Sequence, residues 1–517
     1  MNQIQDAPQV LLFTDLCSPG FGRYAGTYRI ATELRDAGYK VQTIDFFTKW
    51  TNKEILEIVR KFATKELLWA GVSTTFVLPE VVRHRTEVLQ KKWALETRSE
   101  WGKGHGEITG RYDWEDIVDE IRKFSPDCKF VVGGAKAHLI LPDDPYFDHA
   151  VLGQGETAAV ELTQDLFAKR SSGPRKLVKE YNDYTTSRIR YEDSDCIFPG
   201  EHLPIEIARG CIFKCSFCAY PLNGKKLWEF NRDPKLVASD LQDAKDKYGS
   251  EGFIFADDTY NDSPQKVRRL HDEFVKLPFL PKWSSFARAD LMIAKPETIP
   301  LMYESGARSL FFGIETFNTP SAKSIGKGIE ENRLKDGLYA MKEQCPEMII
   351  CSGLIVGLPY DTEETLFRNN EWLAREDCPV DAVIYHPLFV HPHMNVENSG
   401  QENSKMGANP DKYGYTLDQT GNGDWTRHDG MTRADAADIA FRLQEELEPE
   451  IFQVDEETRA EALGRFGRRG SWTFYNRFQN IGFTPQDFKD NSITLSDTMA
   501  KERAVHMKYK ENLYNLA

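Results

Sequence analysis

The chain has 517 residues, of which 40% are hydrophobic, so it is long enough for about two to four domains with cores of their own. Its formal net charge of −15 disfavours a broad basic face for nucleic acid or an anionic membrane, and no apolar run approaches the length of a membrane span. The N-terminal residues lack the pattern of a signal peptide, and most of the nine cysteines are scattered singly. We therefore expect a cytoplasmic protein without a disulfide framework.

The first third of the chain alternates short apolar strands with helical segments. Strands are predicted at 9–16, 40–46, 67–75, 129–134 and 149–153, and helices at 24–38, 54–63, 114–124 and after Glu156. A charged segment, about 80–113, interrupts this alternation. Strands that alternate with helices predict a parallel, doubly wound sheet, which we assign to a first domain at 1–168.

A second α/β pattern follows a polar, turn-rich segment at 169–203, which we interpret as a linker. The predicted strands are 204–210, 252–258, 282–290, 309–316, 349–359 and 381–390. Six such units over 204–395 predict an open or partial (β/α)6 barrel, with ligands at the carboxyl ends of its strands. Residues 396–517 predict a C-terminal domain that starts as a Gly/Asn-rich loop and continues with helices at 431–448 and 455–470.

Three cysteines follow the first strand of the predicted barrel, at Cys211, Cys215 and Cys218, with the spacing C-x3-C-x2-C. Three thiolates in this spacing can hold three irons of a [4Fe-4S] cluster and leave the fourth iron open. A zinc site completed by Cys196 or His202 is the alternative, as are three unligated thiols. Their place at a strand end favours a role in chemistry.

Further residues accompany these cysteines in chain order. Phe217 precedes the third cysteine, and the ends of the four following strands carry Asp257, Asp258, Arg288, Glu315, Gly353 and Gly357. This ordered set resembles the radical S-adenosylmethionine (radical SAM) superfamily. The resemblance implies that the cysteines bind a catalytic [4Fe-4S] cluster and that SAM fills the open iron position.

The resemblance also implies a role for each strand end. Asp257 or Asp258 would hold the ammonium of SAM and Arg288 its carboxylate, as charge-assisted hydrogen bonds. Glu315 would contact the ribose or the carboxylate. Gly353 and Gly357 would let the backbone approach the adenine closely. Structural roles stay open for Asp258 as a cap and for Arg288 as a partner of Asp290.

The first domain narrows the resemblance to the cobalamin-binding radical SAM class, whose first domain is a Rossmann-like fold of the cobalamin-binding type. In free-standing cobalamin domains the first strand is followed by D-x-H-x-x-G, and here Cys17 stands in place of the histidine. The stretch VLGQGE at 151–156 resembles a segment of this class. The implied cobalamin-binding residues are Cys17, Arg23, Ser73, Thr74, Gly133, Gly134, Gly153, Gly155 and Glu156. A domain that binds no corrinoid, a packing role for Cys17 and a solvated Arg23 remain the alternatives.

Polar residues after the last barrel strand are candidates to face the substrate. They are Tyr385, His386, His391, His393 and Trp425. A His-x-His pair is also compatible with metal binding or with a surface position. Trp425 resembles a tryptophan that opens the C-terminal helices in this class, and a packing role is its alternative.

The resemblance therefore predicts a cobalamin-dependent radical SAM methyltransferase. Such an enzyme generates a 5′-deoxyadenosyl radical from SAM and methylates an unactivated carbon of a small molecule or peptide. It takes electrons from a flavodoxin- or ferredoxin-type donor. The alternatives are rearrangement, cyclisation or oxidation with cobalamin redox-active or absent, and a non-enzymatic, zinc-stabilised binding protein. Methylthio transfer is disfavoured because the first domain has no second three-cysteine site.

Overall fold

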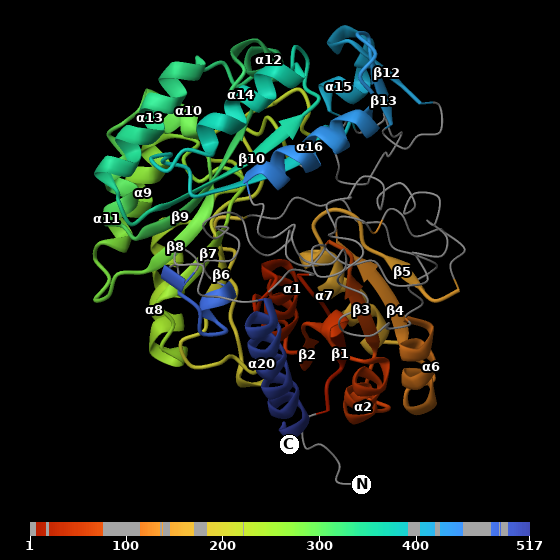
Figure 1. Cartoon of the computed structure of the whole chain (residues 1–517). Helices are drawn as coiled ribbons and strands as arrows, with labels where there is room; N and C mark the ends of the chain where they lie inside the picture. Colours follow the sequence, from red (N-terminus) through yellow and green to blue (C-terminus); the bar gives the residue numbers. More distant parts are fainter. Residues whose placement is uncertain are drawn as a thin grey trace.

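Two parallel α/β sheets form the framework of the chain (Figure 1). The computed structural model describes residues 7–16, 20–75, 114–134, 137, 145–169, 184–220, 222–390, 404–418, 424–447, 477–484, 486–487 and 495–516. The charged segment at 80–113 lies outside the described residues. None of the described helices is long and apolar enough to cross a membrane.

The first sheet contains five parallel strands in the order β2-β1-β3-β4-β5. The strands are β1 (Val10–Phe13), β2 (Val41–Ile44), β3 (Trp69–Ser73), β4 (Lys129–Gly133) and β5 (His149–Ala150). Helices α1 (Ala25–Asp36), α2 (Asn52–Phe62), α6 (Trp114–Phe124) and α7 (Glu156–Phe167) connect and cover them. The direction of winding reverses between β1 and β3, and ligand crevices in such sheets form at the carboxyl ends of the strands at this reversal.

The second sheet contains six parallel strands in consecutive order, β11-β10-β9-β8-β7-β6. They are β6 (Leu203–Glu206), β7 (Gly252–Ala256), β8 (Lys282–Ala287), β9 (Ala307–Glu315), β10 (Ile349–Val356) and β11 (Ala382–Pro387). The helices that cover the outer face are α8 (Pro234–Tyr248), α9 (Pro264–Phe274), α10 (Ala289–Ala294), α11 (Thr298–Glu304), α12 (Thr319–Ile325), α13 (Glu331–Gln344) and α14 (Glu363–Leu373). The two edge strands do not pair in the described residues, so the barrel is open as predicted.

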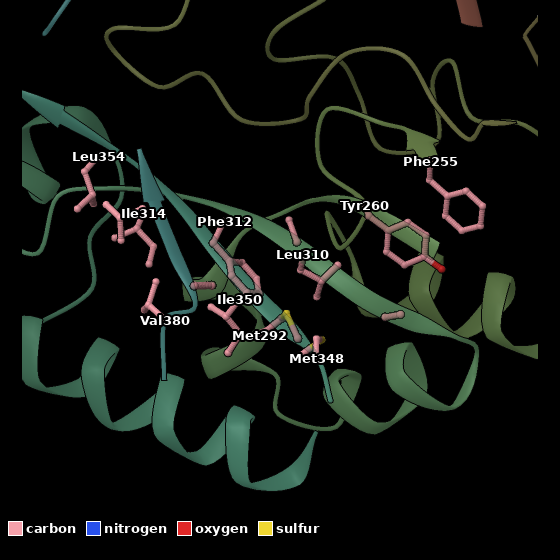
Figure 2. Packing of buried hydrophobic residues seen from close by; sticks show 14 of the residues in the cluster. Phe255, Tyr260, Met292, Leu310, Phe312, Ile314, Met348, Ile350, Leu354 and Val380 are labelled. Atoms are coloured by element: carbon pink, nitrogen blue, oxygen red, sulfur yellow. The ribbon is translucent and has the colours of Figure 1, made fainter. Parts of the chain in front are cut away.

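Alternate residues of each barrel strand point outward into one large core. Phe255, Leu310, Phe312, Ile350 and Leu354 are each 4% exposed or less and pack beneath the helices (Figure 2). Because side chains alternate along a strand, the residues between them face the inside of the open barrel. This alternation fixes which strand-end residues reach the site.

Local sequence signals start the barrel helices directly after the strand-end loops. Asp233 and Ser263 accept hydrogen bonds from backbone N–H groups in the first turns of α8 and α9, and a proline occupies the first helical position of each helix. Side-chain caps and an N-terminal proline both stabilise a helix start. At the other end of α8, Gly249 adopts φ +70°, a conformation that glycine adopts without strain.

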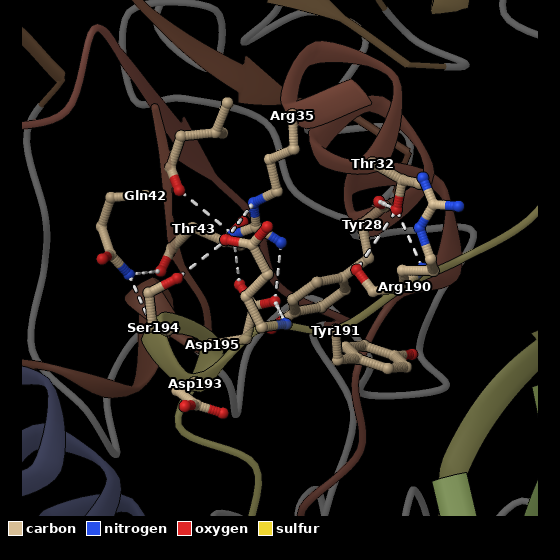
Figure 3. Close-up of polar contacts among 12 residues, drawn as sticks. Tyr28, Thr32, Arg35, Gln42, Thr43, Arg190, Tyr191, Asp193, Ser194 and Asp195 are labelled. Carbon is tan, nitrogen blue, oxygen red and sulfur yellow. Dashed lines mark hydrogen bonds and ion pairs between the residues drawn. The ribbon is translucent and has the colours of Figure 1, made fainter. Parts of the chain in front are cut away.

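The segment predicted as a linker is firmly bound to the first sheet where it is described, from 184 to 202. Arg35 of α1 binds both carboxylate oxygens of Asp195 at 2.8 Å, and Gln42 of β2 donates to the carbonyl of Ser194 at 2.9 Å (Figure 3). Asp195 is completely buried. These contacts make the segment part of the first domain's surface rather than a free connection.

The C-terminal residues contact both sheets. Within the region predicted as a loop, α15 (Lys405–Ala408) is followed by a hairpin of β12 (Tyr415–Leu417) and β13 (Trp425–Arg427). Helix α16 (Arg433–Leu447) packs on β10, β11 and α14, whereas α20 (Leu495–Asn515) returns to the first domain, where Tyr509 is buried against Phe46. The predicted helix at 455–470 lies outside the described residues.

Candidate active site at the carboxyl edge of the second sheet

The three motif cysteines lie in the loop that follows β6. They are partly exposed, whereas the other five described cysteines are buried. The loop is fixed from behind, because the backbone N–H of Ser216 donates to the carbonyl of Ile325 at 3.2 Å and Phe217 packs on the barrel core. The structure therefore presents three accessible thiols on a supported loop.

Each of the three sulfur atoms has a hydrogen-bond partner from outside the motif. The pairs are Cys211 Sγ with Thr259 Oγ1 (3.1 Å), Cys215 Sγ with Arg288 Nη1 (3.5 Å) and Cys218 Sγ with Asn223 Nδ2 (3.1 Å). Burial raises the pKa of the Cys211 and Cys218 thiols. Ligation by iron removes the thiol proton, and hydrogen bonds to the sulfurs tune a cluster. The donor set thus fits three ligands of a [4Fe-4S] cluster.

The zinc alternative finds no support in the described part of the chain. No group of three or more His, Cys, Asp or Glu side chains there is arranged to hold a single metal ion. Cys196 and His202 precede β6, whereas Cys211 follows it. Since a strand rises about 3.3 Å per residue, the length of β6 separates these candidate fourth ligands from the cysteine loop.

The two aspartates after β7 have different environments. Asp257 is buried, and its Oδ2 atom lies 2.7 Å from Nζ of Lys266. Its Oδ1 atom accepts from the backbone N–H of Thr259, the residue beside the sulfur of Cys211. Asp257 therefore orients the loop, which corrects the prediction of a direct ligand contact for this residue.

Asp258 is open to solvent. Desolvation by the surrounding protein and the charge of Asp257 nevertheless raise its pKa to about 6. The carboxylate is thus accessible, although the surrounding protein partly desolvates it. Of the two aspartates, Asp258 is the one available to a cationic ligand.

Two further ionisable side chains, Glu315 and Tyr220, form one electrostatically interacting group with Asp258. Glu315 ends β9 with a left-handed φ of +66°, and its carboxylate lies 3.6 Å from Nζ of Lys327. Tyr220, two residues after Cys218, is 66% exposed, yet desolvation and the charges of Asp258, Cys218 and Glu315 raise its pKa to about 12. The acidic groups, the cysteine and the phenol therefore lie within electrostatic reach of one another.

Arg288 combines a structural and a site-facing role. Its Nε and Nη2 atoms bind Asp290 at 3.0 and 2.6 Å, and its guanidinium lies 4.1 Å from the centre of the Phe213 ring. The predicted pairing with Asp290 is thus present. The remaining Nη1 group donates to Cys215, so the cation lies beside the cysteine loop.

The glycines at the end of β10 face aromatic side chains of the chain itself. A β-carbon at Gly353 would lie 3.0 Å from the Phe311 ring, and one at Gly357 would lie 2.7 Å from the ring of Trp425. Trp425 is 2% exposed and donates to the carbonyl of Leu388. Trp425 therefore has a packing role, which corrects the prediction that it faces the substrate. Contact of Gly353 and Gly357 with SAM stays a prediction.

Adjacent residues of β11 point to opposite sides of the sheet. The hydroxyl of Tyr385 donates to Oδ1 of Asn370 at 2.9 Å in the outer core, so the prediction that Tyr385 faces the substrate is wrong. His386 pairs with Ile355 in the strand register and faces inward, and burial lowers its pKa to about 4. His391 and His393 lie outside the described residues.

The carboxyl edge of the first sheet is formed largely by backbone. The N–H and hydroxyl of Thr74, which follows Ser73, both donate to the carbonyl of Gly133, and a β-carbon at Gly134 would lie 2.8 Å from the Thr74 nitrogen. Glycine is needed here because Gly134 has a φ of +92°. These contacts hold the ends of β3 and β4 together, next to the winding reversal, and the Tyr24 hydroxyl lies 3.1 Å from Oγ1 of the adjoining Thr75.

The charged residues predicted to bind a cofactor at this edge have protein partners. All five N–H groups of Arg23 have acceptors, including both carboxylate oxygens of Glu201, and the side chain is completely buried. Arg23 is therefore corrected to a structural residue. Cys17 lies outside the described residues.

Glu156 joins the two sheets. After Gly153 and Gly155, it begins α7 at the carboxyl edge of the first sheet, and its Oε1 atom lies 2.5 Å from Nη2 of Arg209. Arg209 follows β6 and comes two residues before Cys211. The carboxyl edges of the two sheets therefore meet at this ion pair, directly beside the cysteine loop.

Comparison with known families identifies the domain that contains the second sheet. Residues 205–372 match the radical SAM superfamily. The chain carries a radical SAM domain. The match begins within β6 and ends within α14, so it includes the cysteine loop and the strand ends at Asp258, Arg288 and Glu315.

The curated relatives that this chain matches have names that describe different reactions. The anaerobic magnesium-protoporphyrin IX monomethyl ester cyclase of Cereibacter sphaeroides is 25% identical over 289 residues, which are 49% of this chain and 46% of that protein. The hopanoid C-2 methylase of Rhodopseudomonas palustris is 27% identical over 275 residues, which are 49% of each. The chain thus spans about half the length of the curated relatives it matches.

Solved structures extend the likeness of fold beyond the radical SAM domain. The radical SAM methyltransferase TsrM from Kitasatospora setae, with cobalamin and a [4Fe-4S] cluster bound, matches 96% of this chain and 100% of its own at a TM-score of 0.57 and 14% identity. OxsB, a cobalamin-dependent SAM radical enzyme, matches 98% of this chain and 72% of its own at a TM-score of 0.51 and 14% identity. At these identities the likeness establishes the fold.

Sequence reasoning missed several residues of the radical SAM site. No motif marks Thr259, Asn223 or Lys327, which contact a motif sulfur or the Glu315 carboxylate. Thr259 is 48 residues from Cys211, whereas Asn223 is 5 residues from Cys218. Tyr220 had a usable signal, because an aromatic residue two positions after the last motif cysteine must lie close to the cluster loop.

Proposed function

We propose that this chain is a cobalamin-dependent radical SAM methyltransferase that acts on an unactivated carbon of a small molecule or peptide. The observation that carries the proposal is the meeting of the two carboxyl edges at Glu156 and Arg209. One edge belongs to the radical SAM domain, and the other has the winding reversal at which α/β sheets bind ligands. Two cofactors held at these edges would face the same space.

On the radical SAM side, this chain's residues would bind and orient the nucleotide. Cys211, Cys215 and Cys218 would hold the cluster, and Asp258, accessible and ionised above pH 6, would bind the ammonium of SAM. Arg288 would place a positive charge near the SAM carboxylate. When bound, the cluster supplies the electron that splits SAM, and cobalamin supplies the methyl group.

On the other side, the small-residue surface at Ser73, Thr74, Gly133 and Gly134 would support a large, flat ligand. The backbone of these residues is closely packed, since a β-carbon at Gly134 would lie 2.8 Å from the Thr74 nitrogen, and a macrocycle would lie against this backbone. The likeness in fold to TsrM and OxsB, both of which bind cobalamin, supports this assignment. His386 faces inward, and because burial lowers its pKa to about 4 its imidazole is neutral and would make a hydrogen bond to a substrate group.

A second candidate function is a radical oxidation or cyclisation. The cyclase of Cereibacter sphaeroides matches about as well as the hopanoid methylase does, which favours keeping this candidate. Both functions need the same cluster and SAM site. They differ in whether the methyl group of SAM appears in the product.

The proposal is tested by anaerobic reconstitution with iron, sulfide and hydroxocobalamin, followed by incubation with reductant and SAM labelled with deuterium in its methyl group. We expect cobalamin to remain bound after gel filtration and 5′-deoxyadenosine to form. A labelled product isolated from a cell extract would identify methyl transfer. An unlabelled product with 5′-deoxyadenosine would support the second candidate, and iron-loaded protein that forms no 5′-deoxyadenosine would refute both.

A further inference from the structure

A basic and aromatic surface surrounds the cysteine loop. It consists of Lys214, Lys226, Leu227, Trp228, Arg269 and Lys405, all of them exposed, and we call it the loop face. Lys214 lies between Cys211 and Cys215 in the chain. The loop face is therefore the outer wall of the cluster site.

Contacts between side chains and backbone connect these residues. The side chain of Lys214 packs over Gly224, where a β-carbon would lie 3.4 Å from Cδ of the lysine. Nζ of Lys405 donates to the carbonyl of Lys214 at 2.8 Å, which brings α15 to the loop. The guanidinium of Arg269 on α9 lies 4.4 Å from the centre of the Trp228 ring. Three segments of the chain thus contribute to the face.

The backbone of the loop face is strained. Eight described residues other than glycine have a positive φ, and three of them are Leu222, Trp228 and Phe230. A left-handed conformation is unfavourable for bulky residues and persists where the surrounding structure imposes it, often at functional sites. Of these three residues, Trp228 belongs to the loop face, where it is 36% exposed beside Leu227, which is 43% exposed.

The charge of this region opposes that of the whole chain. Residues 209–235 contain six Lys or Arg and two Asp or Glu, a net charge of +4 in a chain of −15. Arg209, Arg232 and Lys225 bind partners inside the fold, which leaves Lys214, Lys226 and Lys235 exposed. Glu229 is the exposed acid of the loop, and its carboxylate accepts a hydrogen bond from the Lys226 backbone.

We propose that the loop face is the docking site of an acidic one-electron carrier protein. This inference rests on the proposed function, because the cluster must be reduced by one electron while the carrier is oxidised by one. Opposite charges accelerate the association of two proteins. Trp228 and Leu227 would add an apolar contact of the small area that is typical of transient redox complexes. The basic charge of the face favours an acidic partner. The need for one electron makes that partner a redox carrier rather than a nucleic acid or a second copy of this chain, whose own cluster would also need reduction.

The test compares two reductants on one variant. In Lys214→Glu/Lys226→Glu, we expect the rate of 5′-deoxyadenosine formation driven by reduced flavodoxin, its reductase and NADPH to fall about tenfold or more. With dithionite, a small chemical reductant, the rate should equal that of the wild type. Iron content and the cluster's absorption spectrum should also be unchanged, which shows that the cysteine loop is intact.

A matched control reverses two exposed lysines on and after α2. Lys53→Glu/Lys65→Glu carries the same change in net charge in the first domain and should retain full activity with both reductants. Trp228→Ser provides a second variant without charge reversal and should also be selectively slow with flavodoxin. Added salt should slow only the flavodoxin-driven reaction of the wild type.

Three results would overturn the docking site. They are an unchanged flavodoxin-driven rate in both loop-face variants, an equal loss in the control, and a salt-independent rate. Failure of the proposed function is distinguishable, since wild-type protein would then form no 5′-deoxyadenosine even with dithionite.

Discussion

The two sheets have the same parallel architecture but very different carboxyl edges. The edge of the second sheet carries accessible ionisable groups, namely Asp258, Glu315, Tyr220 and three partly exposed cysteines. At the edge of the first sheet, the backbone crossing of Thr74 and Gly134 forms the surface. Its ionisable groups, Arg23, Asp45 and Glu156, are buried on protein partners.

The two carboxyl edges are therefore suited to ligands of different kinds. A charged, chelating ligand needs accessible carboxylates and cations, whereas a large flat ligand needs a surface without long side chains. The charges of the first sheet serve its own core and the junction with the second. Single substitutions on the two carboxyl edges test this difference.

The largest effect is expected for the cluster ligands. Cys218→Ala should abolish both the brown iron–sulfur absorption and 5′-deoxyadenosine formation, because two thiolates cannot hold the cluster. Iron and sulfide analysis after anaerobic reconstitution measures the first, and chromatography the second. Cys345→Ala, a buried cysteine at the end of α13, is the control and should keep both. Full iron content in Cys218→Ala would exclude this residue as a ligand.

The next effect concerns SAM affinity. Asp258→Asn should weaken SAM binding about tenfold or more, since it removes a charge-assisted hydrogen bond worth about 1.5–3 kcal/mol. Isothermal titration under anaerobic conditions measures the dissociation constant. Asp45→Asn, which changes a carboxylate of the first sheet, should leave that constant unchanged. Equal SAM affinity in Asp258→Asn and wild type would contradict the assignment of Asp258.

A smaller effect is expected at the junction of the edges. Glu156→Gln removes the charged partner of Arg209, a loss of roughly 1.5–3 kcal/mol, and should lower the unfolding midpoint by a few degrees. In this variant the Arg209 guanidinium still has Glu206 as an ion-pair partner at 3.0 Å, which limits the loss of stability. Calorimetry measures the midpoint, and the exposed substitution Glu66→Gln is the control. No difference between the two variants would show that the ion pair does not stabilise the junction.

The smallest effect is a pH dependence in the first sheet. Burial raises the pKa of Asp45 to about 8, although the Tyr28 hydroxyl and the Phe46 N–H donate to its carboxylate. A raised folded pKa means that stability is fully present below the unfolded pKa of about 3.9 and is lost as the pH rises towards 8. The free energy of unfolding should therefore fall as the pH rises through this window.

Thermal melts of wild type and Asp45→Asn from pH 5 to pH 9 measure this dependence. The wild type should lose stability more steeply than the variant, with Asp15 and Arg23 unchanged in both. Parallel curves would show that Asp45 does not titrate in the folded protein.

Local patterns in the sequence predicted both sheets and the cysteine loop. Every predicted strand of the two sheets is present, because alternation of apolar strands and helices is a local signal. Cys211, Cys215 and Cys218 lie within eight residues, so their spacing was readable without a fold. The hairpin of β12 and β13 was not predicted, since a Gly/Asn-rich composition hides short strands.

The roles of single polar residues were less predictable, because their partners are distant in sequence. Arg23 binds Glu201, 178 residues away, and Gly357 packs against Trp425. Tyr385 and His386 are neighbours that differ only in strand parity, and the hydroxyl of Tyr385 reaches Asn370 in the outer core. Such pairings are set by the packing of elements rather than by any local motif.

Electron paramagnetic resonance of the reduced protein with and without SAM tests the central claim most directly. If three cysteines hold a cluster with one open iron, the anaerobically reconstituted protein will give a [4Fe-4S] signal that changes when SAM is added. The change should require much more SAM in Asp258→Asn. A cluster signal that SAM leaves unaltered, or protein that takes up zinc and no iron, would contradict the account.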